Sequence, residues 1–440
     1  MNWIFKQSLA VSGFPIESKL MDFASIQSLD LNEREELQQK RAKSIFQFHF
    51  QNNSYYKSLC IQRSNRNFIE DWCDVPILSK SHLQVPFDKI LSQPFDKGNM
   101  HVHNTSGSTG TPFKFAKTKN SHAMAWALYN DRLKSLNITY GDDLQARFYG
   151  IPQKGRTYYK ERIKDLVAGR VRFPVFDMSD SVLSEITNKF RKNRFVYING
   201  YTNSIVLFAN YLIKKEIVLK DLCPSLRLVI PTSEVCTSVH RDLMKRAFGV
   251  DVYNEYGAAE LDVIAMEDSS HNFILNNETL LVELLDDTNQ PVRRGELGRV
   301  VVTSLFNEAM PFIRYDLGDM AIQGDPTSTH HTLLSVEGRK NDAIQLPSGK
   351  ISPGLTIYYV AKLLFEGKPN IREFVVHQME IDSFEFHYTA VSNLSEVEKR
   401  NLEIGFDTYL EPGLRIEFKR FDKIERSKSG KMKTFISHLS

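Results

Sequence analysis

The sequence predicts an α/β protein: a large N-terminal domain with mostly parallel sheets and a β-rich subdomain, and a small α+β C-terminal domain. Three observations predict this fold class. Between residues 144 and 255, β-branched and aromatic runs alternate with amphipathic helical stretches, which is typical of crossover connections in a parallel sheet. After residue 262 the pattern changes to short strands and turns. From about residue 341, helices and strands begin again after a group of turn signals.

Length and composition are those of a multidomain globular protein. The chain has 440 residues, of which 42% are apolar and 25% charged, and its formal net charge is +3. We expect no nucleic-acid partner, although so small a charge is not decisive by itself. We also expect no membrane insertion, because no apolar run approaches the roughly 18 residues of a membrane helix. The scattered cysteines favour a reduced, cytoplasmic protein without a disulfide framework. They are Cys60, Cys73, Cys223 and Cys236.

The expected elements follow from hydrophobic spacing. Residues 1–100 are polar and mostly helical, with the longest helix over 33–52. A further helix is expected over 121–136, and another over 239–248, which Gly249 closes. The strands of the parallel sheet are expected at 144–148, 195–198, 226–230 and 250–253.

The last third of the chain is expected to contain more strands. Short strands at 273–275, 280–285 and 300–303 form the β-rich subdomain. In the C-terminal domain, Ser395 and Glu398 have the spacing of a capping box. That domain is expected to contain helices at 355–366 and 395–410 and strands at 371–376, 384–389 and 414–418.

A segment rich in hydroxyls and glycines, TSGSTGTP at 105–112, is the first candidate binding element. Glycines let backbone N–H groups approach an anion, and Ser and Thr hydroxyls donate to phosphate oxygens. The segment is not a P-loop, because no Gly-Lys-Ser/Thr follows Gly107 at the required spacing. Taken alone, the segment is better explained as a polar surface loop. The candidate phosphate-binding residues are Ser106, Gly107, Ser108, Thr109, Gly110 and Thr111.

Two later segments have the chemistry of a magnesium-nucleotide site. At the end of a predicted strand, Tyr256 can stack on a base, Gly257 permits close backbone approach, and Glu260 can hold Mg²⁺. In RYDLGD, Asp319 can accept the hydroxyls of a ribose from a tight turn. A core tyrosine and a turn aspartate are the ordinary explanations of each segment by itself.

Two more segments carry basic residues. Arg339, in GRKND at 338–342, can reach a phosphate or ribose where the C-terminal domain begins. Lys431, in SKSGK at 427–431, can be brought onto the charge that develops on a phosphate. A polar connection and a solvated basic tail are the alternatives.

Together, in this order, the five segments resemble the motifs of the adenylate-forming superfamily, the acyl-CoA ligases and related carboxylate-activating enzymes. The resemblance extends from residue 105 to residue 431. Within the superfamily, the chain is similar to phenylacetate-CoA ligases and to the CapK-type proteins of bacterial capsule biosynthesis. Ala259 is a departure, because many relatives carry Ser or Thr beside the metal-binding glutamate.

The resemblance implies an adenylation domain at 1–340 and a mobile domain at 341–440 that carries the catalytic lysine. It implies that a carboxylate attacks the α-phosphate of ATP, giving an acyl-adenylate and pyrophosphate, and that a thiol or amine then displaces AMP. ATP and Mg²⁺ are the implied cofactors, with CoA as a possible acceptor. Glu260 would bind Mg²⁺, Tyr256 would lie along adenine and Asp319 would accept the ribose hydroxyls. Lys431 and Arg339 would act on the reacting groups.

The acid pocket is expected to be polar. Its candidate residues come from the segments at 147–153, 199–204 and 231–236. Such a pocket favours a hydroxylated, sugar or amino acid over phenylacetate or a fatty acid. Some of these side chains can instead support the loops. The substrate-binding candidates are Arg147, Tyr149, Asn199, Ser233 and Glu234.

Three other functions are alternatives to this ligase activity. An aryl- or acyl-CoA ligase of the phenylacetate-CoA ligase type differs only in the acid and the acceptor. A non-catalytic nucleotide-binding scaffold is disfavoured, because the residues expected to act on the nucleotide are all present. A zinc hydrolase is disfavoured, because His101 and His103 lack a third ligand of suitable spacing.

Overall fold

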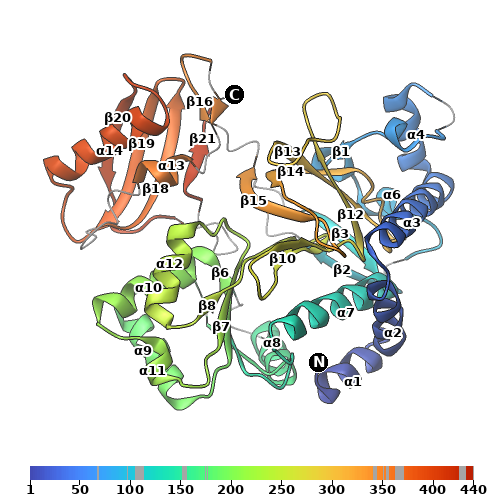
Figure 1. The fold of residues 1–440 in the computed structure, drawn as a ribbon, viewed down its shortest axis with the longest axis horizontal. Helices are drawn as coiled ribbons and strands as arrows, with labels where there is room; N and C mark the ends of the chain where they lie inside the picture. Colours follow the sequence, from blue (N-terminus) through green and yellow to red (C-terminus); the bar gives the residue numbers. More distant parts are fainter. Residues whose placement is uncertain are drawn as a thin grey trace. The chain divides into compact units, whose positions relative to one another are not determined.

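The protein divides into two compact units, seen in the computed structural model (Figure 1). The first unit comprises Met1–Leu317 and Ala321–Ser335, and the second comprises Gly318–Met320 and Val336–Ser440. The division into working domains at residue 340 stays a prediction. The structure describes residues 1–66, 69–96, 98–104, 113–150, 156–173, 175, 177–339, 344–349, 351–352, 356–361, 371–425 and 433–439.

A five-stranded parallel sheet forms one half of the first unit, in the order β5-β4-β6-β7-β8. Aromatic and aliphatic side chains between this sheet and its helices form a continuous core, which confirms the α/β prediction. The strands are β4 (Gln145–Phe148), β5 (Arg170–Phe173), β6 (Tyr197–Tyr201), β7 (Leu228–Thr232) and β8 (Asp251–Val252). The helices are α9 (Asp180–Lys192), α10 (Thr202–Lys214), α11 (Leu219–Leu222) and α12 (Ser238–Phe248).

Two strands of this sheet start two residues later than the sequence predicts. Phe195 and Leu226 are fully buried, yet they lie before β6 and β7 and outside the strand ladder. Apolar spacing indicates burial, and burial extends beyond the hydrogen-bonded part of a strand. The predicted strand ends were therefore displaced, although each strand exists.

An eight-stranded sheet forms the β-rich part, in the order β12-β13-β14-β15-β11-β10-β9, with β1 pairing β14. Two of its strands cover candidate motifs. The residues expected in a tight turn at 315–319 lie in β14, and Tyr256 and Gly257 lie in β9 rather than in a loop. The strands are β1 (Leu78–Ser79), β9 (Glu255–Ala258), β10 (Asp262–Glu267), β11 (Phe273–Leu275), β12 (Leu280–Leu285), β13 (Leu297–Ser304), β14 (Tyr315–Gln323) and β15 (Thr332–Arg339).

Helices dominate the first hundred residues, as predicted. The longest helix begins at Leu31, two residues before the predicted start, because Asp30 and Glu33 form a capping box. A hairpin of β2 (Met100–Asn104) and β3 (Lys114–Thr118) precedes α7. The helices are α1 (Trp3–Val11), α2 (Ile16–Gln27), α3 (Leu31–Asn52), α4 (Ser54–Ser64), η1 (Trp72–Asp74), α5 (Lys80–Leu83), α6 (Phe87–Ile90), α7 (Lys119–Ser135) and α8 (Arg156–Val167).

A buried charge cluster connects α3 and α7 to the turn before β12. Arg132 forms a 2.7 Å ion pair with Glu278, and Arg34 and His330 also contact this carboxylate. Burial opposes ionisation, but Arg132 and His330 hold the pKa of Glu278 well below its usual range. The cluster therefore keeps its charges away from water without leaving the carboxylate unpaired.

The second unit contains a four-stranded sheet in the order β20-β19-β18-β21. A core of aromatic and aliphatic side chains joins it to α13 and α14, which matches the two-layer α+β prediction. Ser395 and Glu398 form the predicted capping box. The elements are β16 (Ile344–Gln345), β17 (Ile351–Ser352), α13 (Thr356–Ala361), β18 (Ile371–Glu380), β19 (Ser383–Ala390), α14 (Glu396–Tyr409), β20 (Arg415–Arg420) and β21 (Phe435–Ser437).

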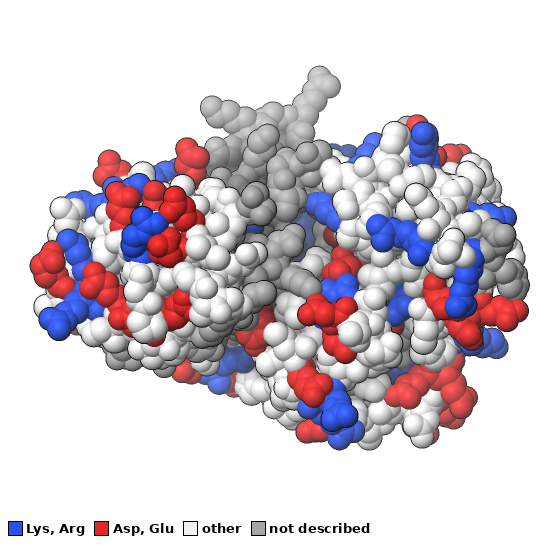
Figure 2. Space-filling view, turned by 90° about the horizontal axis from the view of Figure 1, so that it is seen from above, with Lys and Arg blue, Asp and Glu red and all other residues white. Residues whose placement is uncertain are grey.

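The surface carries both signs of charge. Figure 2 shows Lys and Arg interspersed with Asp and Glu on the face that it presents. In the part of the chain that the structure describes, no helix has the length and apolarity needed to cross a bilayer.

Candidate functional site

The hairpin β2–β3 carries the predicted phosphate loop at its tip. Asn104 of β2 pairs with Lys114 of β3, so residues 105–113 connect the two strands. The loop residues 105–112 themselves lie outside the described residues. The flanking strands fix where the loop leaves and rejoins the fold.

Lys117, on β3, joins this hairpin to the turn that contains Glu260. Its side chain is 3% exposed, and its Nζ donates to the carbonyl oxygen of Ala259 at 2.9 Å. The same Nζ lies 2.7 Å from Oδ1 of Asp262. One contact before Glu260, to Ala259, and one after it, to Asp262, thus attach its turn to the strand that follows the predicted phosphate loop. Lys117 belongs to no motif that the sequence singled out.

Glu260 is buried, and one of its oxygens is fixed by a second motif. The Tyr315 hydroxyl donates to Oε1 of Glu260 at 3.0 Å, and Tyr315 belongs to the RYDLGD segment. Among the residues that the structure describes, Glu260 has no cationic partner. A buried carboxylate without a cation is costly, so this residue fits a divalent metal ion as its missing partner.

Gly257 is explained by the fold as well as by the prediction. A Cβ atom at this position would lie 2.4 Å from the carbonyl oxygen of Asp262, across the β9–β10 pair. The glycine therefore allows β9 and β10 to approach each other, and this reason for a glycine is independent of any ligand. Tyr256 precedes it on β9 and is partly buried.

Asp319 lies on β14, four residues beyond Tyr315, and is partly buried. The expected tight turn at this point is wrong, because the segment is a strand. Gly318 has a positive φ of 76°, so the strand contains a local irregularity just before Asp319.

Arg314, the first residue of RYDLGD, has a structural role. It is buried and forms a 3.0 Å ion pair with Glu283. Its Nη1 donates to three backbone carbonyls, those of Trp72, Cys73 and Val75. The arginine thus holds the segment before β1 against the sheet.

The two basic candidates are less completely described. Arg339 is the last residue of β15, and its side chain lies outside the described part. Lys431 also lies outside the described residues. Their proposed roles stay predictions.

Three of the acid-pocket candidates lie near the carboxyl ends of β4 and β7. The guanidinium carbon of Arg147 lies 4.3 Å from the centre of the Tyr149 ring. The hydroxyls of Tyr149 and Ser233 are 3.4 Å apart. Ser233 has a φ of 70°, which non-glycine residues rarely adopt and which often marks a functional position. The ends of parallel strands are where such sheets bind ligands.

The other two candidates support the scaffold. Asn199 is buried in β6, and its Nδ2 donates to the carbonyl oxygen of Ile230 in β7 at 3.1 Å. The Glu234 carboxylate accepts from the backbone N–H of Asn203 at 2.8 Å, in the first turn of α10. The first turn of a helix has N–H groups without partners inside the helix, and it carries a partial positive charge. The Glu234 carboxylate accepts from one of these N–H groups and complements the charge.

Glu255 is an acid that the sequence analysis missed. It directly precedes Tyr256. Burial raises the pKa of its carboxyl, and this effect exceeds the opposite effects of the hydrogen bond from Thr232 and the nearby charge of Arg147. Its place beside the aromatic residue of the motif was visible in the sequence, but nothing there distinguished it from a surface acid.

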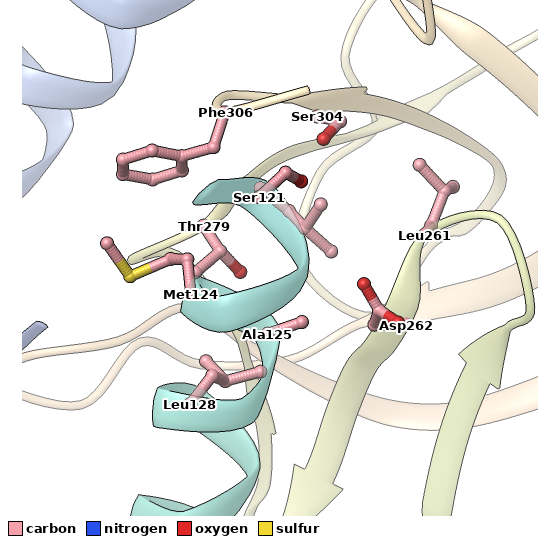
Figure 3. A pocket seen from close by; sticks show the side chains of 10 residues that line it. Ser121, Met124, Ala125, Leu128, Leu261, Asp262, Thr279, Ser304 and Phe306 are labelled. Carbon is pink, nitrogen blue, oxygen red and sulfur yellow. The ribbon is translucent and has the colours of Figure 1, made fainter. Parts of the chain in front are cut away.

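A small pocket adjoins the Glu260 turn (Figure 3). Ser121 and Ala125 of α7 lie on the side of the helix that faces Leu261 and Asp262, and Met124 lies on its other side (Figure 3). None of the predicted site residues lines this pocket. Within the described part of the chain, no three His, Cys, Asp or Glu side chains are arranged to hold a metal ion.

Comparison with known proteins gives consistent relatives. No family model matches the chain. It is 21% identical to "Protein CapK" of Staphylococcus aureus over 429 residues, which cover 93% of this chain and 90% of that protein. It is 23% identical to "Phenylacetate-coenzyme A ligase" of Thermus thermophilus over 336 residues, which cover 72% and 73% of the two chains.

The fold is shared with a solved ligase. The crystal structure of a 2-hydroxyisobutyryl-CoA ligase in the postadenylation state superposes with a TM-score of 0.73 at 17% identity, covering 94% of this chain and 91% of that chain. Relatives along most of the chain, together with this shared fold, support a relationship to the adenylate-forming superfamily.

Proposed function

We propose that the protein is an ATP-dependent carboxylate-activating ligase. It converts ATP and an acid into an acyl-adenylate and pyrophosphate, and then transfers the acyl group to an amine or a thiol such as that of CoA. The observation that carries this proposal is the linkage of three motifs through Glu260. Lys117 ties its turn to the phosphate-loop hairpin, and Tyr315 of RYDLGD binds its carboxylate.

The residues divide the work of the first half-reaction. The hydroxyls and glycines at 106–111 bind the β- and γ-phosphates, Tyr256 lies along adenine, and Asp319 accepts the ribose hydroxyls. Glu260 holds Mg²⁺, which when bound neutralises charge on the triphosphate. Arg339 contacts the ribose or phosphate. Lys431 bridges the acyl carboxylate and the α-phosphate.

The acid is proposed to be small and polar. Arg147, Tyr149 and Ser233 offer a cation and two hydroxyls at the ends of β4 and β7, and such groups favour substrates that can hydrogen-bond. The similarity to CapK supports a role in bacterial surface polysaccharide biosynthesis. The four free cysteines fit a location in the cytoplasm. The similarity to phenylacetate-CoA ligases keeps an aryl-CoA ligase as the alternative.

An ATP–pyrophosphate exchange screen tests the proposal. We expect exchange with hydroxylated, sugar or amino acids, and consumption of the adenylate by CoA or by an amine, identified by mass analysis of the products. Exchange with aryl acids alone, followed by CoA-dependent turnover, would establish the aryl-CoA ligase instead.

A Lys431→Ala variant separates an enzyme from a scaffold. It should lose pyrophosphate exchange while it still binds ATP, because the lysine acts on the reacting groups rather than on adenine or ribose. If neither the variant nor the wild-type chain exchanges with any acid while both bind ATP, the non-catalytic scaffold is correct.

A further inference from the structure

Helix α8 exposes an apolar stripe. Tyr159, Ile163 and Leu166 follow the spacing i, i+4, i+7, which places them on one side of a helix. They are 69%, 65% and 82% exposed. A stripe of this spacing normally faces a core, so its exposure on a well-packed protein points to a partner.

The opposite face of α8 is already occupied. Asp165 is buried and pairs with Arg170 and Arg172 of β5, at 2.6 Å and 2.7 Å. Glu161 also binds Arg172, at 3.2 Å. Burial by itself would raise the pKa of Glu161, but the stronger effects of Lys164 and Arg172 hold this pKa below its usual range. Asp165 is therefore turned inward, Glu161 binds both Arg172 and the exposed Lys164, and Lys160 lies beside the outward stripe.

Helix α1 extends the exposed surface. It packs against α8, as Figure 1 also shows, and it anchors itself through buried Phe5 and Leu9. Trp3, Ile4 and Val11 remain exposed, and the tryptophan is 71% exposed. The two helices thus contribute six large apolar side chains that are more than half exposed. We call this set the α1–α8 surface: Trp3, Ile4, Val11, Tyr159, Ile163 and Leu166.

We propose that the α1–α8 surface docks the protein onto an anionic lipid bilayer. Trp and Tyr favour the boundary between acyl chains and headgroups, and aliphatic side chains beside them enter the acyl region. Lys160 and Lys164 lie beside the stripe and are exposed. Lys164 pairs with Glu161 at 2.7 Å, so Lys160 supplies the positive charge that meets the negative headgroups. The helices lie on the bilayer rather than across it.

Charge favours a lipid surface over a second copy of the chain. In a two-fold dimer, the same patch meets itself, so Lys160 and its copy would be brought into one interface. Anionic headgroups neutralise these lysines instead. The inference is independent of the proposed function, because none of these residues belongs to the nucleotide or acid site.

Vesicle co-sedimentation of the full chain tests the proposal. We expect binding to vesicles of phosphatidylcholine with phosphatidylglycerol, and weak binding to phosphatidylcholine alone. An Ile163→Asp/Leu166→Asp variant should lower the vesicle partition about tenfold or more, since two anchoring side chains are lost. Lys160→Glu should lower it about fivefold, and its effect should shrink at about 0.5 M salt.

Val397→Asp is the matched control. Val397 lies on α14 and is 70% exposed, so the change has the same chemistry away from the α1–α8 surface. It should leave vesicle binding unchanged, and all variants should keep the wild-type melting temperature. Equal binding by the Ile163→Asp/Leu166→Asp variant, or no binding by the wild type, overturns the proposal. So does a concentration-dependent dimer in sedimentation that the same variant abolishes.

Discussion

The hydroxyl of Tyr315 donates a 3.0 Å hydrogen bond to Oε1 of Glu260, so a residue of β14 fixes the buried carboxylate that closes the YGAAE segment. The bond joins residues 55 positions apart in the chain. It leaves the other carboxylate oxygen available to a cation, and the hydroxyl sets the direction in which that oxygen points.

Removing this hydroxyl should weaken the enzyme at the proposed metal-dependent step. Tyr315→Phe loses a hydrogen bond to a charged group, and we expect pyrophosphate exchange to fall about tenfold, with a higher Mg²⁺ concentration at half-maximal rate. Tyr140→Phe is the control, because the Tyr140 hydroxyl is buried without a partner in the described structure. An unchanged Mg²⁺ dependence in Tyr315→Phe would contradict the positioning role.

Lys117 should contribute to stability through the same turn. Lys117→Met leaves the carbonyl of Ala259 and the carboxylate of Asp262 without their cation, and we expect the free energy of unfolding to fall by about 1–3 kcal/mol. Because Asp262 is partly exposed, water compensates for some of the loss.

A double-mutant cycle checks the pairing of Lys117 with Asp262. Asp262→Asn should cost less than Lys117→Met, and the double variant should be more stable than the sum of the single losses predicts. Additive losses in urea denaturation would show that the two side chains stabilise the fold independently.

Much of this fold follows from local sequence pattern. The alternation between 144 and 255 predicts the parallel sheet, since each strand and helix there buries its own apolar residues. Capping signals fixed particular ends, as with Ser395 and Glu398. The strand status of 315–323 was not predictable, because Gly318 and the flanking acids read as a turn, and only pairing within the eight-stranded sheet overrides that preference.

The candidate site was predictable in its motifs but not in its connections. Glu260 has the residue type of a metal ligand, whereas Lys117 and Tyr315 act through contacts between distant segments. Sequence also could not show that Asn199 and Glu234 make hydrogen bonds that support the scaffold. Their amide and carboxylate serve a neighbouring strand and a helix end, which only the folded arrangement brings near.

Arg314 should be a stability residue in spite of its place in a segment expected to bind nucleotide. Arg314→Lys keeps the charge but cannot donate at once to Glu283 and to the carbonyls of residues 72, 73 and 75. We expect a loss of about 2–4 kcal/mol in chemical denaturation, while the exchange rate per folded molecule changes less than threefold, on the order of 0.6 kcal/mol. A large fall in rate with unchanged stability would instead place the guanidinium at the nucleotide.

Stacked histidines beside the phosphate-loop hairpin predict a loss of stability in acid. His101 and His122 have ring centres 4.0 Å apart, and Phe14, Trp126, His103 and Lys117 surround them. Burial, followed by Lys117 and neighbouring histidines, lowers the pKa of His101 to about 4 and that of His122 to about 2.

The sign of the effect follows from proton uptake by the unfolded chain. As pH falls below about 6.5, His101 and His122 bind protons in the unfolded state but not in the folded state. Stability is therefore lost between about pH 6.5 and pH 4. His122→Phe keeps the ring contacts and should recover up to about 2 kcal/mol of the loss at pH 5, measured against its own stability at about pH 7.5. If the free energy of unfolding of the variant depends on pH as that of the wild type does, other groups, such as buried His49 and His240, cause the acid sensitivity.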